Sequence, residues 1–230
     1  MSGEVRVQAA IRLDHVLMLA FDTATTSVSV ALHDGTDILA EVSGEGAMAH
    51  GEQLTPTIAR VLEQAGRTPD ELTDIAVGVG PGPYTGLRVG VVTALTLSHT
   101  LHIPAHGVCS LDALGFAAQR ELNLEHEFVA ATDARRKEIY WARFDTSGKR
   151  VSEPAVDKPN TVAELGLPVV GRGGQLHAQT LDWREGPLDP KASDMARLLV
   201  NQSVKVLPVE PLYLRRPDAV PQSQQKIVTP

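Results

Sequence analysis

The sequence predicts an α/β protein in which two groups of strands and helices follow one another along 230 residues. Continuous apolar runs at 16–22 and 74–80 are typical of strands that are buried on both faces of a sheet. Between such runs, apolar residues recur at helical spacing. In each group one strand ends in an aspartate, Asp22 in the first and Asp133 in the second, so the two groups share a theme.

The first group spans residues 16–122 and opens with a three-strand meander. Strands are expected at 16–22, 27–33 and 37–42, and Asp34-Gly35 between the last two is a hairpin-turn signal. The rest of the group alternates between helix and strand, with a helix at 53–66, a strand at 74–80, a helix at 87–101, a strand at 103–108 and a helix at 110–121.

Three residues are expected to mark helix ends in this group. Pro56 fits the first turn of the helix at 53–66, where a missing N–H is tolerated, and Gly66 fits its C-terminal stop. Ser110 is the candidate N-cap of the helix at 110–121.

The second group spans residues 123–216, and its last segment is expected to return toward the first group. Two strands are expected at 127–134 and 137–145, followed by a middle rich in proline and glycine. A strand near 167–171, a glycine turn over Gly171–Gly174 and a helix at 193–204 complete the group. Residues 1–15 are interpreted as a loose leader, and the polar segment 217–230 as a disordered tail.

Composition narrows the function classes. The formal charge of −7 argues against a surface that grips nucleic acid by clustered Lys and Arg. The single cysteine, Cys109, cannot form an internal disulfide, which fits a reducing compartment. No secretory signal and no membrane-spanning run are recognised, so a cytoplasmic location without membrane contact is expected.

The stretch "GVGPGPYTGLRVG" at 78–90 raises the question of a phosphate-binding loop. It lacks the Gly-Lys pair of a P-loop, and Pro83 stands where a dinucleotide-binding loop has its third glycine. Pro81 and Pro83 also remove two N–H donors. The alternative is that the glycines permit close packing, because Gly86, Gly90 and Ala94 form one strip on the following helix.

That following helix is apolar almost all round, so it is buried on more than one side. One side is expected in the core of the chain. The other is expected in a subunit interface, with a purely internal role as the alternative.

Four stretches of the sequence resemble a known family. They are "LAFDTATTSVSVALHDG", "HGEQLTPTIARVLEQAG", "DIAVGVGPGPYTGLRVGVVTALTLSHTLHIPAHGVCSLDAL" and "ATDARRKEIYWARFD". The resemblance is to the TsaB (YeaZ) family, bacterial subunits of tRNA threonylcarbamoyladenosine biosynthesis, and "EPLYLR" near the C-terminus is similar to the family's final signature.

The resemblance implies an actin-like ATPase fold (ASKHA, ribonuclease H-like) of two similar lobes, with mixed sheets flanked by helices. It implies a heterodimer with a TsaD-like protein, which transfers the threonylcarbamoyl group, and a TsaE-like ATPase reached through the complex. In isolation a homodimer is expected, and tRNA is expected to be reached only through the complex. The expected interface residues lie on the helices at 53–66 and 87–101: Leu54, Ile58, Val61, Leu62, Gly86, Leu87, Gly90, Val91, Ala94 and Leu95.

The resemblance also implies that this chain is a scaffold without catalytic residues. The catalytic relatives carry two metal-binding histidines spaced H-x-x-x-H, and the matching places here fall near Ser110 and Leu114, with Asp112 between them. A leucine cannot bind a metal, so no metal site is expected.

No cofactor is required by this interpretation, but weak binding of ATP or ADP with Mg²⁺ is a possibility. The residues for a vestigial nucleotide site are Asp22, Thr23, Thr25, Thr26 and Asp133. The alternative functions are a weak ATPase or another enzyme of the actin-like superfamily, kinase-like or glycoprotease-like. A direct RNA-binding module is disfavoured, because aromatic residues make up 4% of the chain and no stacking platform is evident.

Overall fold

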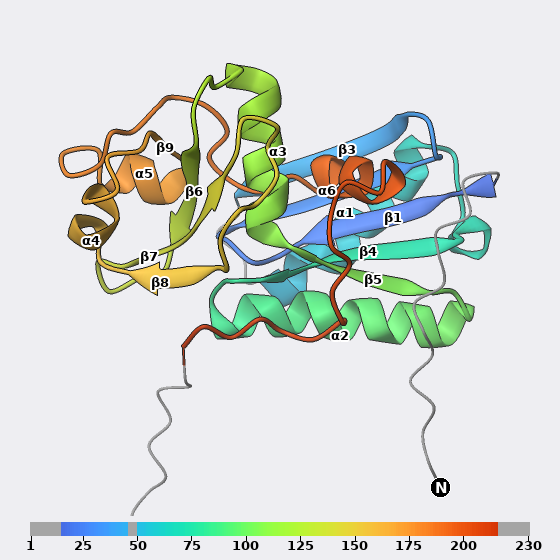
Figure 1. The fold of residues 1–230 in the computed structure, drawn as a ribbon. Coiled ribbons are helices and arrows are strands. Elements are labelled where there is room, and N and C mark those ends of the chain that lie inside the picture. The colour runs from blue at the N-terminus through green and yellow to red at the C-terminus, as the bar shows by residue number, and fades with distance from the viewer. Residues whose placement is uncertain (1–14, 46–49, 216–230) are drawn as a thin grey trace, which may run out of the picture.

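The computed structural model describes residues 15–45 and 50–215 and shows two lobes side by side (Figure 1). The leader predicted at 1–15, apart from His15, and the tail predicted at 217–230 lie outside these residues. The first lobe contains, in chain order, β1 (Met18–Asp22), β2 (Ser27–His33), β3 (Ile38–Glu45), α1 (His50–Gln64), a short 3-10 helix (Pro69–Glu71), β4 (Asp74–Gly80), α2 (Tyr84–Leu101), β5 (Ala105–Cys109) and α3 (Ser110–Leu122).

These strands form one mixed sheet in the order β3-β2-β1-β4-β5. β2 pairs antiparallel with β1 and β3, whereas β4 pairs parallel with β1 and β5, so the expected meander and the helical crossovers are confirmed. The β2–β3 hairpin turns at Asp34, whose N–H donates to the carbonyl of Asp37 at 3.1 Å. Gly35 takes a φ of 97°, a conformation that costs glycine little.

The second lobe is smaller and has its own sheet in the order β8-β7-β6-β9. β7 pairs antiparallel with β6 and β8, and β9 pairs parallel with β6. The chain then returns to the first lobe through its last helix. The elements are β6 (Phe128–Asp133), β7 (Ile139–Phe144), β8 (Ala155–Asp157), α4 (Pro159–Ala163), β9 (Val169–Val170), α5 (Arg172–Leu176) and α6 (Ala192–Val200).

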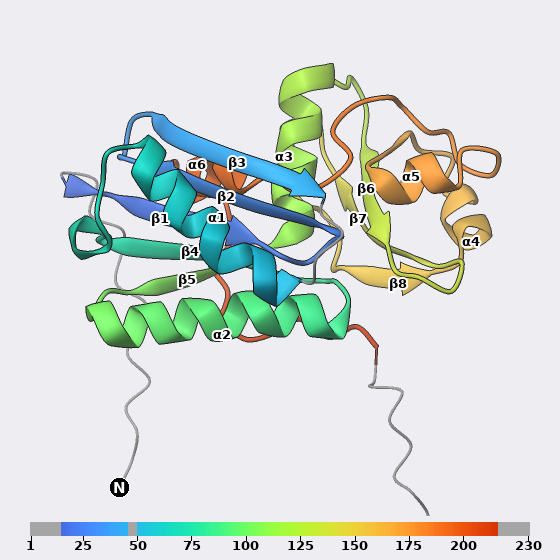
Figure 2. The same cartoon turned by 180° about the vertical axis from the view of Figure 1, so that it is seen from behind.

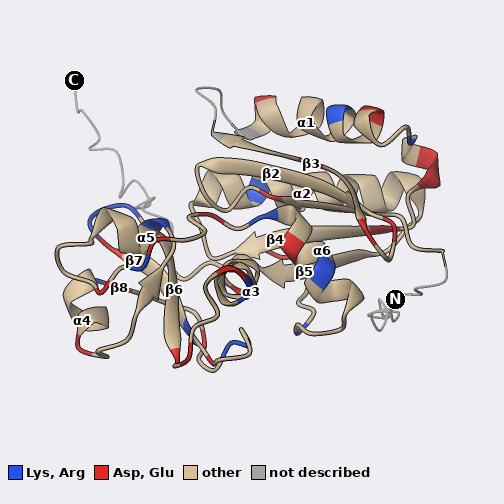
Figure 3. Cartoon of the chain, turned by 90° about the horizontal axis from the view of Figure 1, so that it is seen from above, with Lys and Arg blue, Asp and Glu red and all other residues tan. Residues whose placement is uncertain are grey.

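Helices cover both faces of the first sheet (Figures 2 and 3). α1 and α2 pack on one face, which Leu19 and Phe21 of β1 help to form, and α6 packs on the face that carries Met18 and Ala20. Because both faces are covered, β1 is buried at every position, as its continuous apolar run predicts.

Helix α3 stands between the two lobes and belongs to both cores (Figure 1). On the second-lobe side, Leu111, Leu114 and Ala118 pack against Phe128 and Phe144, whose rings stack 5.6 Å apart. One helix therefore joins the two sheets through side-chain packing as well as through the chain.

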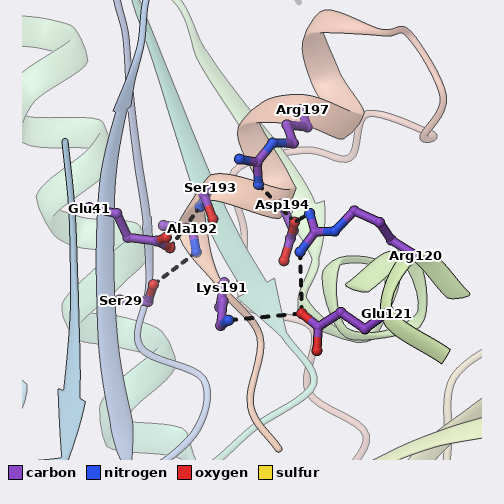
Figure 4. Close-up of polar contacts among 9 residues, drawn as sticks. All are labelled: Ser29, Glu41, Arg120, Glu121, Lys191, Ala192, Ser193, Asp194 and Arg197. Atoms are coloured by element: carbon purple, nitrogen blue, oxygen red, sulfur yellow. Dashed lines mark hydrogen bonds and ion pairs between the residues drawn. The ribbon is translucent and has the colours of Figure 1, made fainter. Parts of the chain in front are cut away.

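Helix α6 is anchored to the first lobe by polar contacts (Figure 4). The N–H of Ala192 donates to Oγ of Ser29 at 2.9 Å, so a side chain of β2 satisfies one of the free amides at the start of α6. Asp194 is fully buried, and its Oδ1 pairs with Arg120 of α3 and with Arg197 at 3.1 Å. Burial raises the pKa of the Asp194 carboxyl, and the two arginines oppose that rise.

Three local expectations about the elements need correction, and two short elements were not expected. Helix α1 begins at His50, so Pro56 lies in its second turn and removes a helical amide donor there. The turn at Gly171 leads directly into α5, and the helix expected to reach 204 ends at Val200. β8 and α4 were not expected, because their three and five residues are too short for a periodic pattern.

Candidate functional site

The loop at 78–90 and the turn after β1 pack directly against each other. Oγ1 of Thr23 donates a hydrogen bond to the carbonyl of Gly86 at 2.8 Å. A Cβ on Gly90 would lie 2.6 Å from that same Oγ1, and a Cβ on Gly82 would lie 2.9 Å from Cα of Ala24. These glycines are therefore required by the close approach of the two segments, as the close-packing interpretation predicted.

Asp22, the central residue of the predicted nucleotide site, is almost fully buried. Its Oδ1 accepts a hydrogen bond from the N–H of Ala24 at 2.7 Å, and its Oδ2 accepts one from Oγ of Ser110 at 2.5 Å. Ser110 also accepts a hydrogen bond from the N–H of Gly80 at 3.3 Å. The carboxylate thus links β1 to α3 directly and to β4 through the hydroxyl of Ser110.

The expectation that Ser110 caps α3 is wrong. Helix α3 begins at Ser110 itself and Cys109 precedes it as the N-cap, without a side-chain capping bond. The hydroxyl of Ser110 is committed to Asp22 and Gly80 instead. Burial raises the pKa of the Cys109 thiol to about 12, so this residue is a core side chain and not a nucleophile.

Leu114 and Asp112, which lie in the stretch where the catalytic relatives carry H-x-x-x-H, have structural roles in this chain. Leu114 is fully buried between the lobes. Asp112 pairs with Nε of Arg150 at 2.6 Å, and burial raises the pKa of its carboxyl while the guanidinium opposes the rise. Among the residues that the structure describes, no group of three or more His, Cys, Asp or Glu side chains is placed to hold a metal.

Three of the predicted nucleotide-site residues, Thr25, Thr26 and Asp133, do meet at the boundary between the lobes. They line a cavity of about 10 Å³, whose lining also includes the ion pairs of Arg135 with Asp133 and of Arg172 with Asp189. That space holds about one water, whereas small-molecule pockets measure about 300–1,000 Å³. Thr23 does not line the cavity and is fully buried. Nucleotide binding at these residues stays a prediction.

The structure changes which residues can form the predicted interface. All but one of the ten named residues are buried in the core of this chain, so they cannot contact a partner directly. The buried residues are Leu54, Ile58, Val61, Leu62, Gly86, Leu87, Gly90, Val91 and Ala94. Leu95 is 49% exposed, and Val92 is exposed by 59% on the same outer side of α2. The interface stays a prediction, with these outer residues as its members.

Sequence reasoning missed a pocket of about 290 Å³ where three segments meet: the loop before α2, the β6–β7 turn and the C-terminal segment. We call it the tyrosine pocket, because it contains all three tyrosines of the chain. Its lining is Gly82, Pro83, Tyr84, Ala134, Arg135, Arg136, Tyr140, Tyr213, Leu214 and Arg215. The sequence features that contribute to this pocket are the motifs "ARRKE" and "EPLYLR", which are far apart in the sequence.

Comparisons with known proteins agree with this architecture. The family model described as TsaD, tRNA N6-adenosine threonylcarbamoyltransferase, matches residues 39–198. The tRNA threonylcarbamoyladenosine biosynthesis protein TsaB of Escherichia coli is 33% identical over 223 residues, covering 86% of this chain and 94% of the relative. The structure of YeaZ from Pseudomonas aeruginosa superposes with a TM-score of 0.70 at 28% identity, over 86% of this chain and 100% of that one.

Two mycobacterial relatives are also similar, although both are described as uncharacterised. The Mycobacterium tuberculosis protein is 40% identical over 209 residues, or 89% of this chain and 94% of the relative. The Mycobacterium leprae protein is 42% identical over 211 residues, and there the match spans 56% of the relative. Within the described residues, no helix is long and apolar enough to cross a bilayer. The predicted α/β fold of two lobes, with mixed sheets flanked by helices, is confirmed, and the chain belongs to the TsaB (YeaZ) family.

Proposed function

We propose that this chain is a non-catalytic subunit that pairs with a TsaD-like protein in the threonylcarbamoylation of tRNA. Its family membership supports a role in tRNA threonylcarbamoyladenosine biosynthesis. The observation that carries the proposal is the outer face of α2, which presents apolar side chains to solvent while the inner face is core. Such a face on a soluble chain is typical of a protein–protein contact.

The outer face of α2 has the regularity that a helix-to-helix contact needs. Tyr84, Arg88, Val92 and Leu95 follow one another at spacings of four, four and three, so they lie along one side of the helix. Aromatic, arginine and aliphatic side chains of this kind dominate the energy of protein interfaces. The occupant in the complex is the TsaD-like partner, and in its absence a second copy of this chain.

The residues near which the family resemblance puts the catalytic histidines support the non-catalytic part of the proposal. Ser110 is bonded to Asp22 and Gly80, and Leu114 fills the core between the lobes. Neither offers a ligand to a metal, and restoring one would disturb packing that joins α3 to both sheets. In this proposal the TsaD-like partner performs the transfer, and a TsaE-like ATPase acts through the complex.

The test is a charge placed on the outer face of α2. Leu95→Glu is expected to weaken binding of a TsaD-like protein at least tenfold in calorimetry, because a carboxylate must lose its water at an apolar contact. It is also expected to convert the isolated chain from dimer to monomer in light scattering. The matched control is Leu176→Glu, since Leu176 is similarly exposed, at 56%, but lies in the second lobe.

Equal partner affinity for both variants would contradict the interface. Reconstitution of tRNA modification with and without the chain tests the wider role, because modification should require its presence. The enzyme alternative makes a different prediction: the isolated chain would bind ATP with Mg²⁺ and turn it over. Turnover that is lost on replacing Asp133 with asparagine would favour that alternative.

A further inference from the structure

The tyrosine pocket adjoins the outer face of α2 and shares Tyr84 with it, but most of its lining lies on other segments. It joins three tyrosines to three arginines in a chain whose net charge is −7. Hydrogen bonds hold its walls together. The N–H of Leu212 donates to the carbonyl of Val79 at 2.7 Å, and Nη1 of Arg215 donates to the carbonyl of Ala134 at 2.9 Å. The pocket is therefore formed by the fold and does not depend on one mobile side chain.

The β6–β7 turn supplies the positive charge. Arg135, Arg136 and Lys137 are three consecutive exposed cations with φ of 62°, 53° and 61°, the left-handed region that side chains other than glycine rarely occupy. Strain of this kind concentrates at functional positions. In Figure 3 basic segments lie beside the point where the described C-terminal segment ends. The carboxylates that flank the turn in sequence, Asp133 and Glu138, are ion-paired with Arg135 and Arg215 respectively.

The other wall supplies aromatic surface. The rings of Tyr84 and Tyr213 stack with their centroids 5.0 Å apart, and each side chain stays more than one-third exposed. The Arg88 guanidinium lies 3.9 Å from the centre of the Tyr84 ring, and its Nε donates to the hydroxyl of Tyr213 at 3.1 Å. The sequence analysis did not foresee this pair of stacked rings, because the two tyrosines are 129 positions apart.

We propose that the tyrosine pocket binds single-stranded RNA, with an unpaired base against Tyr213 and the adjoining phosphates along the Arg135–Lys137 turn. Stacked aromatic rings beside a line of cations are what binding of unpaired nucleic acid requires, and duplex RNA would not offer its bases to the rings. Several kinds of ligand combine an aromatic ring with a phosphate, and the choice of RNA among them rests on the proposed function. The proposal departs from the expectation that tRNA is reached only through the partner.

The test measures anisotropy of a fluorescein-labelled, 12-nucleotide single-stranded RNA of mixed sequence with the full chain. Saturable binding is expected, and a 12-base-pair RNA duplex is expected to bind at least tenfold more weakly. Tyr213→Ala is expected to weaken binding about 5- to 150-fold, the usual effect of losing one base–aromatic stack, whereas Tyr213→Phe keeps the ring and should bind like the parent chain.

Charge reversal at the turn tests the phosphate contacts. Arg136→Glu is expected to weaken binding and to lower the slope of log affinity against log salt by about 0.7, the value of one phosphate contact on a single strand. The matched control is Arg184→Glu, an equally large charge change beside β9, where the Arg184 side chain is exposed and pairs with Asp182. Its affinity and slope should equal those of the parent chain.

Three results would overturn the inference: no binding of the RNA, equal binding of duplex and single strand, or full displacement of the RNA by AMP at the same nucleotide concentration, which would make this a mononucleotide site.

Failure of this inference is separable from failure of the proposed function. A chain that supports tRNA modification but binds no RNA refutes only the inference. A chain that binds RNA through Tyr213 but neither pairs with a TsaD-like protein nor supports modification refutes only the proposed function.

Discussion

Replacing Gly82 with alanine tests the contact between the loop before α2 and the turn after β1. An added Cβ would lie 2.9 Å from both Cα and the carbonyl carbon of Ala24. Carbon atoms in good contact are about 3.5–4.0 Å apart, so the segments would have to separate by about 0.6 Å or more. The obstacle is backbone, and no rotation of a side chain can relieve the clash.

Overpacking of this kind costs about 1–3 kcal/mol. For a chain of this length, 1 kcal/mol shifts the melting temperature by about 2–4 °C, so Gly82→Ala should melt roughly 2–12 °C lower in a circular dichroism scan. Gly44→Ala is the control, because a Cβ there meets nothing within 4 Å and should leave stability almost unchanged. Equal melting temperatures for the two variants would refute the close-packing interpretation of the loop.

Three further predictions concern single side chains. Asp194→Ala should lower the free energy of unfolding in urea by about 1.5–3 kcal/mol, because it removes the charge-assisted bond to Arg120 that ties α6 to α3 and the bond to Arg197 within α6. The control is Lys191→Ala, which should cost less than about 1 kcal/mol, because Nζ of Lys191 lies 4.0 Å from Glu121 at the surface. Hydrogen bonds from the N–H groups of Asp37 and Thr36 lower the pKa of the Asp34 carboxyl in the folded chain. The ionised carboxylate therefore stabilises the fold at a pH above the ordinary pKa of 3.8, and this stabilisation is lost as the pH falls through the folded-state pKa. Below pH 4 the melting temperature of Asp34→Ala should therefore fall less steeply with pH than that of the parent chain. The same pH dependence of melting temperature in both chains would contradict this. Cys109, fully buried with a pKa of about 12, should resist thiol reagents in the native chain and react only on unfolding in guanidinium.

The sequence was sufficient for the order of elements because each had a local signal. Strands β2 and β4 begin and end where the patterns placed them, and Gly66 ends α1 with a φ of 63°. The start of α2 was less accurate, at Tyr84 and not Leu87, because Thr85 and Gly86 carry no helical preference of their own. Tertiary contact with Thr23 fixes the first turn there.

The site was harder to predict, because it depends on which side of a helix faces solvent. Helix α2 is apolar nearly all round, and its periodicity cannot say that Leu87 and Val91 face the sheet while Val92 and Leu95 face outward. The same limit applies to the tyrosine pocket. Tyr84 and Tyr213 meet only because the C-terminal segment runs back along the first lobe.

The return of α6 also sets the order in which the molecule can be completed during synthesis. The face of the first sheet that carries Met18 and Ala20 is closed by Met195 and Leu199, which leave the ribosome after the whole second lobe. Until then the nascent chain displays an apolar sheet face to the cell, the kind of surface that chaperones bind. The ribosome must therefore synthesise the whole second lobe before α6 can complete the first lobe.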